Sequence, residues 1–394
     1  MKIQLDKKTL AEALALLERV IPSRSSNPLL TYLSLALPAA IPDGKGGALV
    51  LTGTNGEVDL RLFVLPSGRE PVLGSGHVLI PAAPLAQVVR NLPGEEVLLE
   101  VEGELSLASA SFQTRFAVAD PEGFPEPLFP EPRLRLKAQD LLRALTHVRY
   151  AASNEEYRAI FRGIQLEFSE GGLRAVASDG YRLAVYDLKG APVLERSAKL
   201  VVPARSVDEV VRVLKAVASP GDSDEVDLGF AEGTLGLSLA PKERPLGVRM
   251  AVRLMEGEFP DYERVIPKEY VLEAEVEADT LRESLKRVSV LADRQNHRVD
   301  LFFESASPLG EAREGRLTLS AEGDYGKGRE ELPVRASGVA MTVSFNARYL
   351  LDALGPLEGP VRLRLSGAQT PAVVSGGGEG EPDGYLAVVV PLRV

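Results

Sequence analysis

The 394-residue chain contains no cysteine, no tryptophan and only three histidines. Without a thiol there is no disulfide, iron–sulfur cluster, zinc–thiolate site or cysteine nucleophile. His77, His147 and His297 stand far apart in the sequence, which argues against a histidine-rich metal site, whereas Mg²⁺ or Ca²⁺ held by carboxylates stays open. We therefore expect neither a metal site nor a cofactor.

Long apolar runs are also missing. The longest, residues 29–42, is too short and too interrupted by proline to span about 30 Å of hydrocarbon. The N-terminus carries charges at Lys2, Asp6, Lys7 and Lys8 in place of the hydrophobic stretch of a signal peptide. With 45% hydrophobic and 26% charged residues, the composition is that of a globular protein of two to four domains. We expect a cytosolic protein.

Motifs of common enzyme classes are absent. The chain has no P-loop, no H-E-x-x-H and no G-x-S-x-G motif, and Gly326-Lys327-Gly328 is followed by arginine instead of serine or threonine. Asp222, Asp224 and Asp227 are spaced as in a calcium loop but lack its glycine and its final carboxylate, which indicates a solvated turn. No carboxylate pair stands out as an acid–base couple. A non-catalytic protein is expected.

The net charge is −11, which argues against a protein that coats nucleic acid with its whole surface. This charge still permits a local basic face within an acidic exterior.

One pattern of helices and strands occurs three times along the chain. Apolar residues recur at helical spacing in six segments, which begin near residues 10, 85, 141, 207, 281 and 347. Between them lie runs that alternate with a period of two, such as residues 112–118, 248–254 and 272–277. Helix, strands, helix and strands thus recur about every 131 residues, a third of the chain. The pattern predicts three similar α+β domains, over residues 1–126, 127–254 and 255–394.

Helix starts and linkers support this division. Ser206 with Glu209 and Thr280 with Glu283 have the spacing of capping boxes, and Asn346 suits an N-cap. Residues 120–132 hold five prolines, which predicts a stiff linker, and Phe259-Pro260 echoes it in the next repeat.

Three motifs make the sequence recognisable. Residues 176–184 (VASDGYRLA), 259–265 (FPDYERV) and 390–394 (VPLRV) closely resemble the bacterial DNA sliding clamps, the beta subunits of DNA polymerase III. The resemblance covers the whole chain. It implies three sliding-clamp domains, each with two helices packed on β-sheets, and a head-to-tail homodimer that closes into a ring. Such a ring encircles double-stranded DNA, slides without sequence specificity and tethers the polymerase for processive replication.

The resemblance also implies DNA contacts. Arg24, Arg158 and Arg205 match family positions near DNA, and Arg149 and Arg162 add positive charge at the helices and their flanks. These five residues are the predicted DNA-binding set, with contacts to phosphates. The sequence departs from the family's basic, polar or aromatic contact positions at Ala83, Glu155, Ala159 and Ile160.

A partner-peptide pocket and a subunit joint are implied as well. The pocket would take short Gln/Leu/Phe-type peptides from the replicative polymerase, other polymerases, the clamp loader and repair proteins. Its matching residues are Phe161, Ser178, Gly180, Tyr181, Arg182, Leu183, Pro260, Arg264, Val265, Ala347, Val388, Val389, Val390, Pro391, Leu392, Arg393 and Val394. At the joint, Phe116 and Val118 would face the partner subunit's Val290 and Leu291, with edge strands pairing across it.

Two alternatives remain at this point. A ring scaffold for protein partners alone would lack a systematic positive face on its helices. An enzyme with an inter-domain site would need paired carboxylates, and the sequence nominates none.

Overall fold

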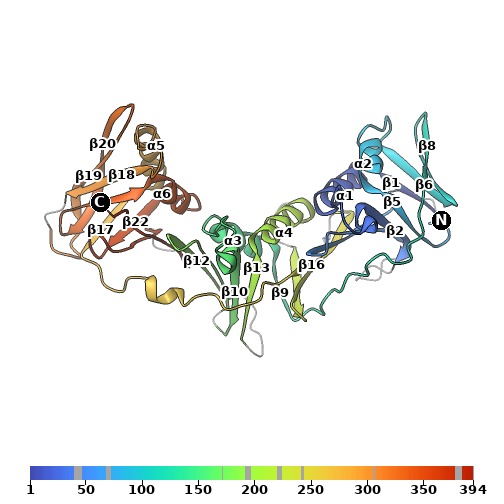
Figure 1. Cartoon of the computed structure of the whole chain (residues 1–394), viewed down its shortest axis with the longest axis horizontal. Coiled ribbons are helices and arrows are strands. Elements are labelled where there is room, and N and C mark those ends of the chain that lie inside the picture. Colours follow the sequence, from blue (N-terminus) through green and yellow to red (C-terminus); the bar gives the residue numbers. More distant parts are fainter. Residues whose placement is uncertain are drawn as a thin grey trace. The chain divides into compact units, whose positions relative to one another are not determined.

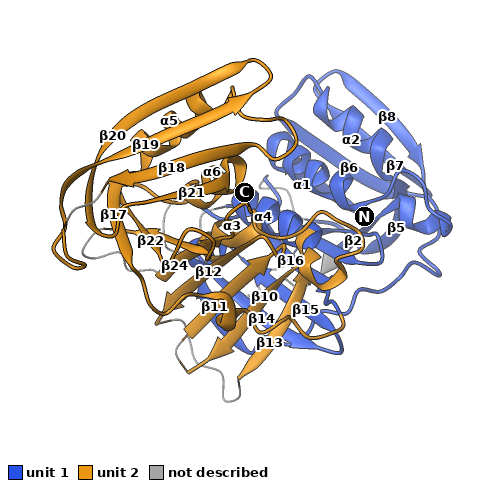
Figure 2. Cartoon of the chain, turned by 60° about the vertical axis from the view of Figure 1, so that its left-hand side comes forward, with its two compact units in different colours: residues 1–142, 205–255 blue, residues 143–204, 256–394 orange. Residues whose placement is uncertain are grey.

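The computed structural model describes residues 1–39, 47–67, 72–170, 172–190, 197–219, 224–240, 244–304, 307–377 and 384–393. Within these ranges the chain forms six α-helices and 24 strands (Figure 1). Contacts divide it into two compact units, residues 1–142 with 205–255 and residues 143–204 with 256–394 (Figure 2).

The first unit contains two sheets and three helices. The helices are α1 (Lys7–Val20), α2 (Ala82–Arg90) and α4 (Ala204–Val217), with the short 3₁₀ helix η1 (Pro28–Thr31). The four-stranded sheet has the order β1 (Lys2–Asp6), β6 (Glu96–Glu102), β7 (Glu104–Ser109), β8 (Phe112–Ala117). The eight-stranded sheet has the order β5 (Gly76–Pro81), β2 (Tyr32–Ala39), β3 (Ala48–Thr54), β4 (Val58–Val64), β16 (Leu246–Arg253), β15 (Thr234–Leu239), β14 (Glu225–Ala231), β9 (Leu134–Lys137).

The second unit is built on one twelve-stranded sheet. Its helices are most of α3 (Ala138–Arg149), α5 (Ala278–Ser289) and α6 (Ala347–Leu354), with η2 (Ala159–Arg162) and η3 (Tyr262–Val265). The strand order is β13 (Ala198–Pro203), β10 (Gly163–Ser169), β11 (Gly172–Ser178), β12 (Arg182–Lys189), β24 (Gly384–Val389), β23 (Ala372–Gly376), β22 (Pro360–Leu365), β17 (Leu272–Glu277), β20 (Gly326–Gly338), β19 (Arg313–Gly323), β18 (Arg298–Glu304), β21 (Met341–Asn346).

Strand order reveals the three-fold repeat directly. The order β5-β2-β3-β4 recurs eight strands later as β13-β10-β11-β12 and again as β21-β18-β19-β20. The order β1-β6-β7-β8 recurs as β9-β14-β15-β16 and as β17-β22-β23-β24. Each third of the chain therefore supplies eight strands and two helices. This confirms the predicted α+β class and the three-part repeat.

The middle third is shared between the two units because its sheets continue into both neighbours. β4 pairs with β16, and β12 pairs with β24, both antiparallel. These two ladders join strands that belong to different thirds, so contacts across them are as dense as contacts within a third. The proposed boundaries at 126/127 and 254/255 fall in the connections between β8 and β9 and between β16 and β17.

Helices α4 and α5 begin earlier than the sequence predicted, directly after the preceding strands. The capping boxes predicted at Ser206 and Thr280 are wrong, since α4 begins at Ala204 and α5 at Ala278. Asn346 is the N-cap of α6, as predicted, and its side chain accepts from the Arg348 N–H at 3.0 Å.

Positive side chains cap the C-terminal ends of several helices. Arg282 of α5 donates to the carbonyls of Leu354 and Leu357 at the end of α6, at 2.8 and 2.7 Å. Lys7 of α1 donates to the carbonyl of Leu92 beyond α2 in the same way. Cations satisfy the free carbonyls there and favour the negative end of the helix dipole. Some helix cations therefore have a structural role.

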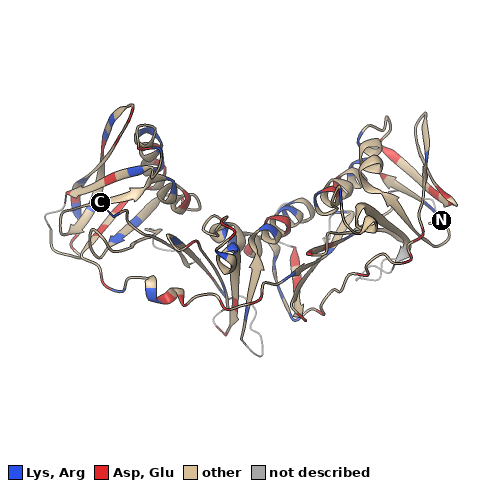
Figure 3. Cartoon of the chain, viewed as in Figure 1, with Lys and Arg blue, Asp and Glu red and all other residues tan. Residues whose placement is uncertain are grey.

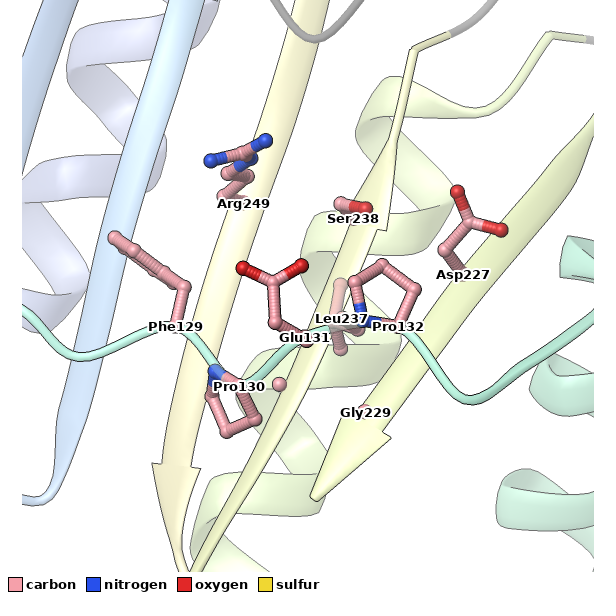
Figure 4. A pocket seen from close by; sticks show the side chains of 10 residues that line it. Phe129, Pro130, Glu131, Pro132, Asp227, Gly229, Leu237, Ser238 and Arg249 are labelled. Atoms are coloured by element: carbon pink, nitrogen blue, oxygen red, sulfur yellow. The ribbon is translucent and has the colours of Figure 1, made fainter. Parts of the chain in front are cut away.

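A linker crosses the eight-stranded sheet in the first unit. Residues 129–132 lie over Gly229 of β14 and Gly236 of β15, which face each other in the ladder (Figure 4). A Cβ on Gly229 would collide with the carbonyl of Glu131, and one on Gly236 would lie 2.8 Å from Cδ of Pro130. The two glycines form a trench that holds the linker against the sheet.

Candidate functional site

The turn between β11 and β12 is fixed by its own side chains. The Asp179 carboxylate accepts from the N–H groups of Tyr181 and Arg182, at 2.9 and 3.0 Å, and from Nε of Arg182 at 3.0 Å. The Ser178 hydroxyl donates to the Arg182 carbonyl at 2.8 Å. Gly180 has φ +87°, a conformation that favours glycine. The Ser-Asp-Gly sequence therefore presents Tyr181 in one position.

Four side chains stack beside this turn, and we call them the aromatic stack: Arg158, Tyr181, Tyr349 and Arg182. The Arg158 guanidinium lies 4.7 Å from the Tyr181 ring centre, and the Tyr181 and Tyr349 rings are stacked at 6.5 Å. On the far side, the Arg182 guanidinium lies 4.6 Å from the Tyr349 ring. Cations over aromatic faces are attracted by the ring quadrupole. The stack links the segment before η2, the β11–β12 turn and α6.

Arg158 encloses the turn as well as stacking on it. Its guanidinium donates to the Asp179 carbonyl and, at 3.2 Å, to the Tyr181 hydroxyl. It also pairs with Glu155 at 2.8 Å. A Cβ on Gly180 would lie 2.6 Å from Nη1 of Arg158, so the glycine leaves the space that Arg158 occupies.

Below the stack, Arg182 ties the turn to α6. Besides Asp179 it pairs with Asp352, and it lies 5.4 Å from the Tyr150 ring. The hydroxyls of Tyr150 and Tyr385 are 2.7 Å apart, and Tyr385 donates to the Ala353 carbonyl at 2.8 Å. Burial raises the pKa of both tyrosines, which keeps them as neutral hydrogen-bond donors.

Sequence reasoning missed Tyr349, Asp352 and Tyr150. The repeat offers a signal for the first, since Pro203-Ala204-Arg205 and Asn346-Ala347-Arg348 begin α4 and α6 in the same way. Tyr349 then occupies the place of a small, buried serine, Ser206, and is a departure within the repeat.

The C-terminal segment leaves the sheet beside this turn. β24 ends at Val389, so the expectation that Pro391 lies outside a central ladder is confirmed. The Val390 N–H donates to the Tyr181 carbonyl at 2.9 Å, and the Leu392 N–H donates to the Ser344 carbonyl at 2.8 Å. Pro391 is buried. Val394 lies outside the described residues.

An apolar cluster lies between the sheet and the segment around η3. Leu183, Val388 and Tyr262 are buried in it, and Phe259 and Ile266 pack against it. Phe259 also meets Phe161 edge to face at 6.0 Å. Burial raises the pKa of Tyr262 to about 12, and its hydroxyl donates to Glu167 at 3.0 Å.

The described residues of the predicted pocket all belong to the second unit, and we call the buried ones its floor and the exposed ones its rim. The buried floor residues are Ser178, Leu183, Ala347, Val388, Val389 and Pro391. The exposed residues are Gly180, Tyr181, Pro260, Arg264, Val265, Val390 and Arg393, and Phe161, Arg182 and Leu392 are half-buried. Tyr181, Val265 and Val390, at 48%, 50% and 37% exposure, are large apolar side chains exposed to solvent.

The predicted DNA-binding arginines differ in their exposure and in the contacts that they already make. Arg24 and Arg205 are exposed, and neither forms an ion pair within the described part of the chain. Arg149 donates Nε to the Ala204 carbonyl at 3.1 Å, and Arg162 is half-buried at the end of η2. Arg158 is engaged in the aromatic stack. The repeat places one more exposed cation, Arg348, where Arg205 stands in the preceding third.

The helices as a group are basic. They contain thirteen lysines and arginines against eight acidic residues, an excess of five positive charges in a chain of net charge −11 (Figure 3). The rest of the chain is correspondingly acidic. This favours a nucleic-acid interface on the helices over a scaffold for proteins alone.

Of the four departures from the family, Glu155 alters a local contact. Glu155 neutralises Arg158, Ile160 is half-buried, and Ala83 and Ala159 are exposed.

The predicted joint residues lie at an edge strand of the first unit and in the turn after α5 of the second. Phe116 and Val118 are half-buried, on or just after β8, the edge strand of the four-stranded sheet. Val290, 75% exposed, and Leu291 follow α5 in the second unit. Nearby, β20 pairs with β17 only over residues 335–338, so residues 326–334 have β19 alone as a ladder partner in the described chain.

Among the residues that the structure describes, no three acidic or histidine side chains are grouped as a metal site. Nor does any described helix have the length and apolar character to cross a bilayer.

Comparisons with known proteins cover the chain from end to end. Residues 1–126, 135–261 and 263–381 match the N-terminal, central and C-terminal domains of the DNA polymerase III beta subunit family. The beta sliding clamp of Synechococcus elongatus is 29% identical over 402 residues, and that of Streptomyces coelicolor 28% over 405, each over the whole of both chains. The sliding clamp of Pseudomonas aeruginosa bound to griselimycin has a TM-score of 0.85 at 24% identity, over both chains in full. The DNA polymerase III beta subunit of Thermotoga maritima has a TM-score of 0.83 at 24% identity, over 100% of this chain and 99% of that one.

Proposed function

This chain belongs to the DNA polymerase III beta subunit family, the bacterial beta sliding clamps, and from that premise we propose that it encircles duplex DNA as a ring. The ring slides without reading sequence and tethers the replicative polymerase, so that synthesis is processive. The observation that carries this function is the match of all three family domains, in order, along the chain. The role is non-catalytic, and it places the protein in the cytoplasm with the chromosome.

The proposed DNA contacts are made by residues of the helices and of the segments that flank them. Arg24 and Arg205 are the strongest candidates because they are exposed and hold no ion pair in the described residues. Arg162, Arg149 and Arg158 complete the proposed set, with Arg348 added by the repeat. Phosphate contacts carry no sequence information and weaken with salt, which suits a protein that slides.

The repeat supports a head-to-tail homodimer. Within the chain, β4 meets β16 and β12 meets β24. The remaining members of the series are β20 and β8: β8 is an edge strand, and residues 326–334 of β20 have β19 alone as a ladder partner in the described chain. We infer that β20 of one copy pairs with β8 of another, beside Phe116, Val118, Val290 and Leu291. Two copies then satisfy each other's edges and close a ring.

The partner site is the surface formed by the rim residues Tyr181, Pro260, Val265 and Val390 over its apolar floor. Burying a leucine or phenylalanine of a partner there is worth about 1.5–3 kcal/mol per side chain, enough to dominate the affinity of a short peptide. Polymerases, the clamp loader and repair proteins would compete for one such site per subunit.

Retention on DNA tests the function. The protein is loaded by its cognate clamp loader onto circular and onto linear duplex, and the fraction bound is followed through gel filtration. We expect loss from linear DNA by sliding off the ends and retention on circles. Equal retention on both would contradict topological linkage, and binding to neither would favour a scaffold for proteins alone.

A further inference from the structure

A second cavity lies beside the partner site, and we call it the outer cavity. It has a volume of about 420 Å³ and is bounded by strands β11, β12, β22, β23 and β24 and by the segment after η3. Val185 lines it, on the opposite face of β12 from Tyr186. None of the residues predicted for the partner pocket lines it.

The floor of the outer cavity is continuous with the floor of the partner site. Its apolar lining residues Val185, Ile266 and Leu386 belong to the same packed cluster as Leu183 and Val388. Leu183 and Val185 are two residues apart on one face of β12, so about 7 Å separates them along the strand. An extended peptide seated on Leu183 covers that distance in two residues.

Both carboxylates of the outer cavity are committed to one arginine. Arg174 pairs with Asp187 at 2.5 and 3.1 Å and with Glu263 at 3.2 Å. The hydrogen bond to Asp187 raises the pKa of Arg174, whose charge is therefore permanent. These three residues largely compensate one another.

Two further cations line the same space without an ion pair among the described residues. Lys268 is exposed, and Arg364 is half-buried with its guanidinium 4.8 Å from the Tyr270 ring. Nε of Arg364 is buried and has no hydrogen-bond partner. Glu273 is opposite Arg364 in the ladder of β17 and β22, yet no ion pair joins them, and neither cation has one within the described ranges. An unsatisfied buried donor is costly, so an anion brought to this place is favoured.

We propose that the outer cavity binds an acidic side chain of the partner peptide, next to the apolar residues that fill the partner site. This inference rests on the proposed function, because it extends the same peptide. Its grounds are the continuous apolar floor, the buried Nε of Arg364 without a hydrogen-bond partner, and two cations without an ion pair among the described residues. The acidic residue lies about two to four positions from the nearest apolar anchor, given the rise of an extended chain. The outer cavity thereby selects among peptides that share one apolar motif.

Fluorescence anisotropy tests the inference with two labelled peptides. Both contain the same Gln/Leu/Phe motif, and their flanking residues are Glu and Asp in one and Gln and Asn in the other. The wild-type dimer should bind the acidic peptide about tenfold more tightly at low salt, two pairs contributing about two- to fivefold each. Lys268→Gln and Arg364→Gln should each remove part of this preference while leaving the affinity for the neutral peptide unchanged. Lys215→Gln is the matched control, because Lys215 is an exposed cation of α4 in the first unit, outside the cavity, with no ion pair among the described residues.

The outcomes separate this inference from the proposed function. Equal affinity for the two peptides, or a preference that persists in both variants, overturns the inference and leaves the partner site intact. Failure of both peptides to bind the wild-type protein overturns the partner site itself and the inference with it. Because Lys268 is exposed, its substitution leaves the fold intact, and the result for Arg364 is judged against it.

Discussion

At the scale of single residues, two roles are possible for Arg158, contact with DNA and support of the β11–β12 turn, and one guanidinium cannot serve both at once. The resemblance places it near DNA, whereas its hydrogen bonds go to Asp179 and Tyr181 and its charge is paired with Glu155. A phosphate would have to displace these contacts. Arg24, by contrast, is exposed and forms no ion pair among the described residues that a phosphate would have to displace. The two arginines should therefore differ in what they support.

Arg158→Ala should weaken binding of a partner peptide about fivefold, the equivalent of about 1 kcal/mol for a lost hydrogen bond that holds Tyr181. It should leave the salt dependence of DNA binding nearly unchanged. Arg24→Ala with Arg205→Ala should do the reverse, lowering the log–log salt slope by about one for each lost phosphate contact. Anisotropy with peptide and with DNA over a salt series measures both. A changed slope for Arg158→Ala alone would return that residue to the DNA interface.

Gly180→Ala and Gly56→Ala form a matched pair that isolates the contact with Arg158. The backbone φ is +87° at Gly180 and +88° at Gly56, but a Cβ on Gly56 would meet nothing within 4 Å. Each substitution should destabilise its turn by about 1–3 kcal/mol through backbone strain. Only Gly180→Ala should also lower peptide affinity, because the new Cβ displaces Arg158. Thermal unfolding and anisotropy report the two effects separately, and equal loss of affinity in both variants would contradict the contact.

At the scale of elements, the sequence predicted the features that depend on local patterns and did not predict those that depend on tertiary contacts. Period-two and helical patterns predicted β17, α5 and the three-part repeat, because burial of one face fixes those periods. The capping boxes failed because α4 and α5 begin where the preceding strands end. The aromatic stack could not be foreseen, since Arg158, Tyr181 and Tyr349 are far apart in the chain and are brought together only by the sheet and α6. The prolines of residues 120–132 predicted a linker, but they did not indicate that Gly229 and Gly236 of the sheet would hold it.

Gly229→Ala should release the linker from this trench. The added Cβ meets the backbone carbonyl of Glu131, which cannot move without breaking the bond from the Arg133 N–H to the Leu228 carbonyl, 2.7 Å long. We expect a loss of about 1–3 kcal/mol, as for other overpacked sites. Gly247→Ala in β16 is the control, because its nearest atom would lie 3.6 Å away. Denaturant unfolding compares them, and equal stability of the two variants would mean that the linker is not held by the trench.

Deletion of residues 390–394 should abolish peptide binding and leave the dimer intact. The described part of this segment contributes two backbone hydrogen bonds and buried Pro391, so stability should fall by about 1–3 kcal/mol at two net hydrogen bonds. Val390 is part of the rim of the partner site. Anisotropy beside light scattering of the same sample tests both halves. Retained peptide affinity would remove the segment from the site, and dissociation to monomers would make it structural.

At the scale of the whole molecule, we expect pairing of β8 with β20 of a second copy to set the assembly. Leu291→Glu should yield monomers, since a carboxylate buried at the joint has no partner. Leu291 also packs within its own subunit, its Cδ1 being 3.2 Å from where a Cβ on Gly328 would lie. Val290→Glu is therefore the cleaner companion, because Val290 is 75% exposed in the single chain. Sedimentation at micromolar concentration decides, and dimers that persist in both variants would move the joint elsewhere.

The proposed pairing of β8 with β20 would also set the kinetics of assembly. Because both edges belong to the same chain, a head-to-tail pair closes two identical seams, of which the first forms between molecules and the second within one complex. The second seam closes at an effective concentration fixed by the geometry, independent of how much protein is present. If one seam opens, the other keeps the two chains together, and the gap heals as a unimolecular event. The two subunits therefore separate only when both seams are open at the same time, and the probability of this is the product of the two opening probabilities. Entry of DNA into the ring requires only one open seam.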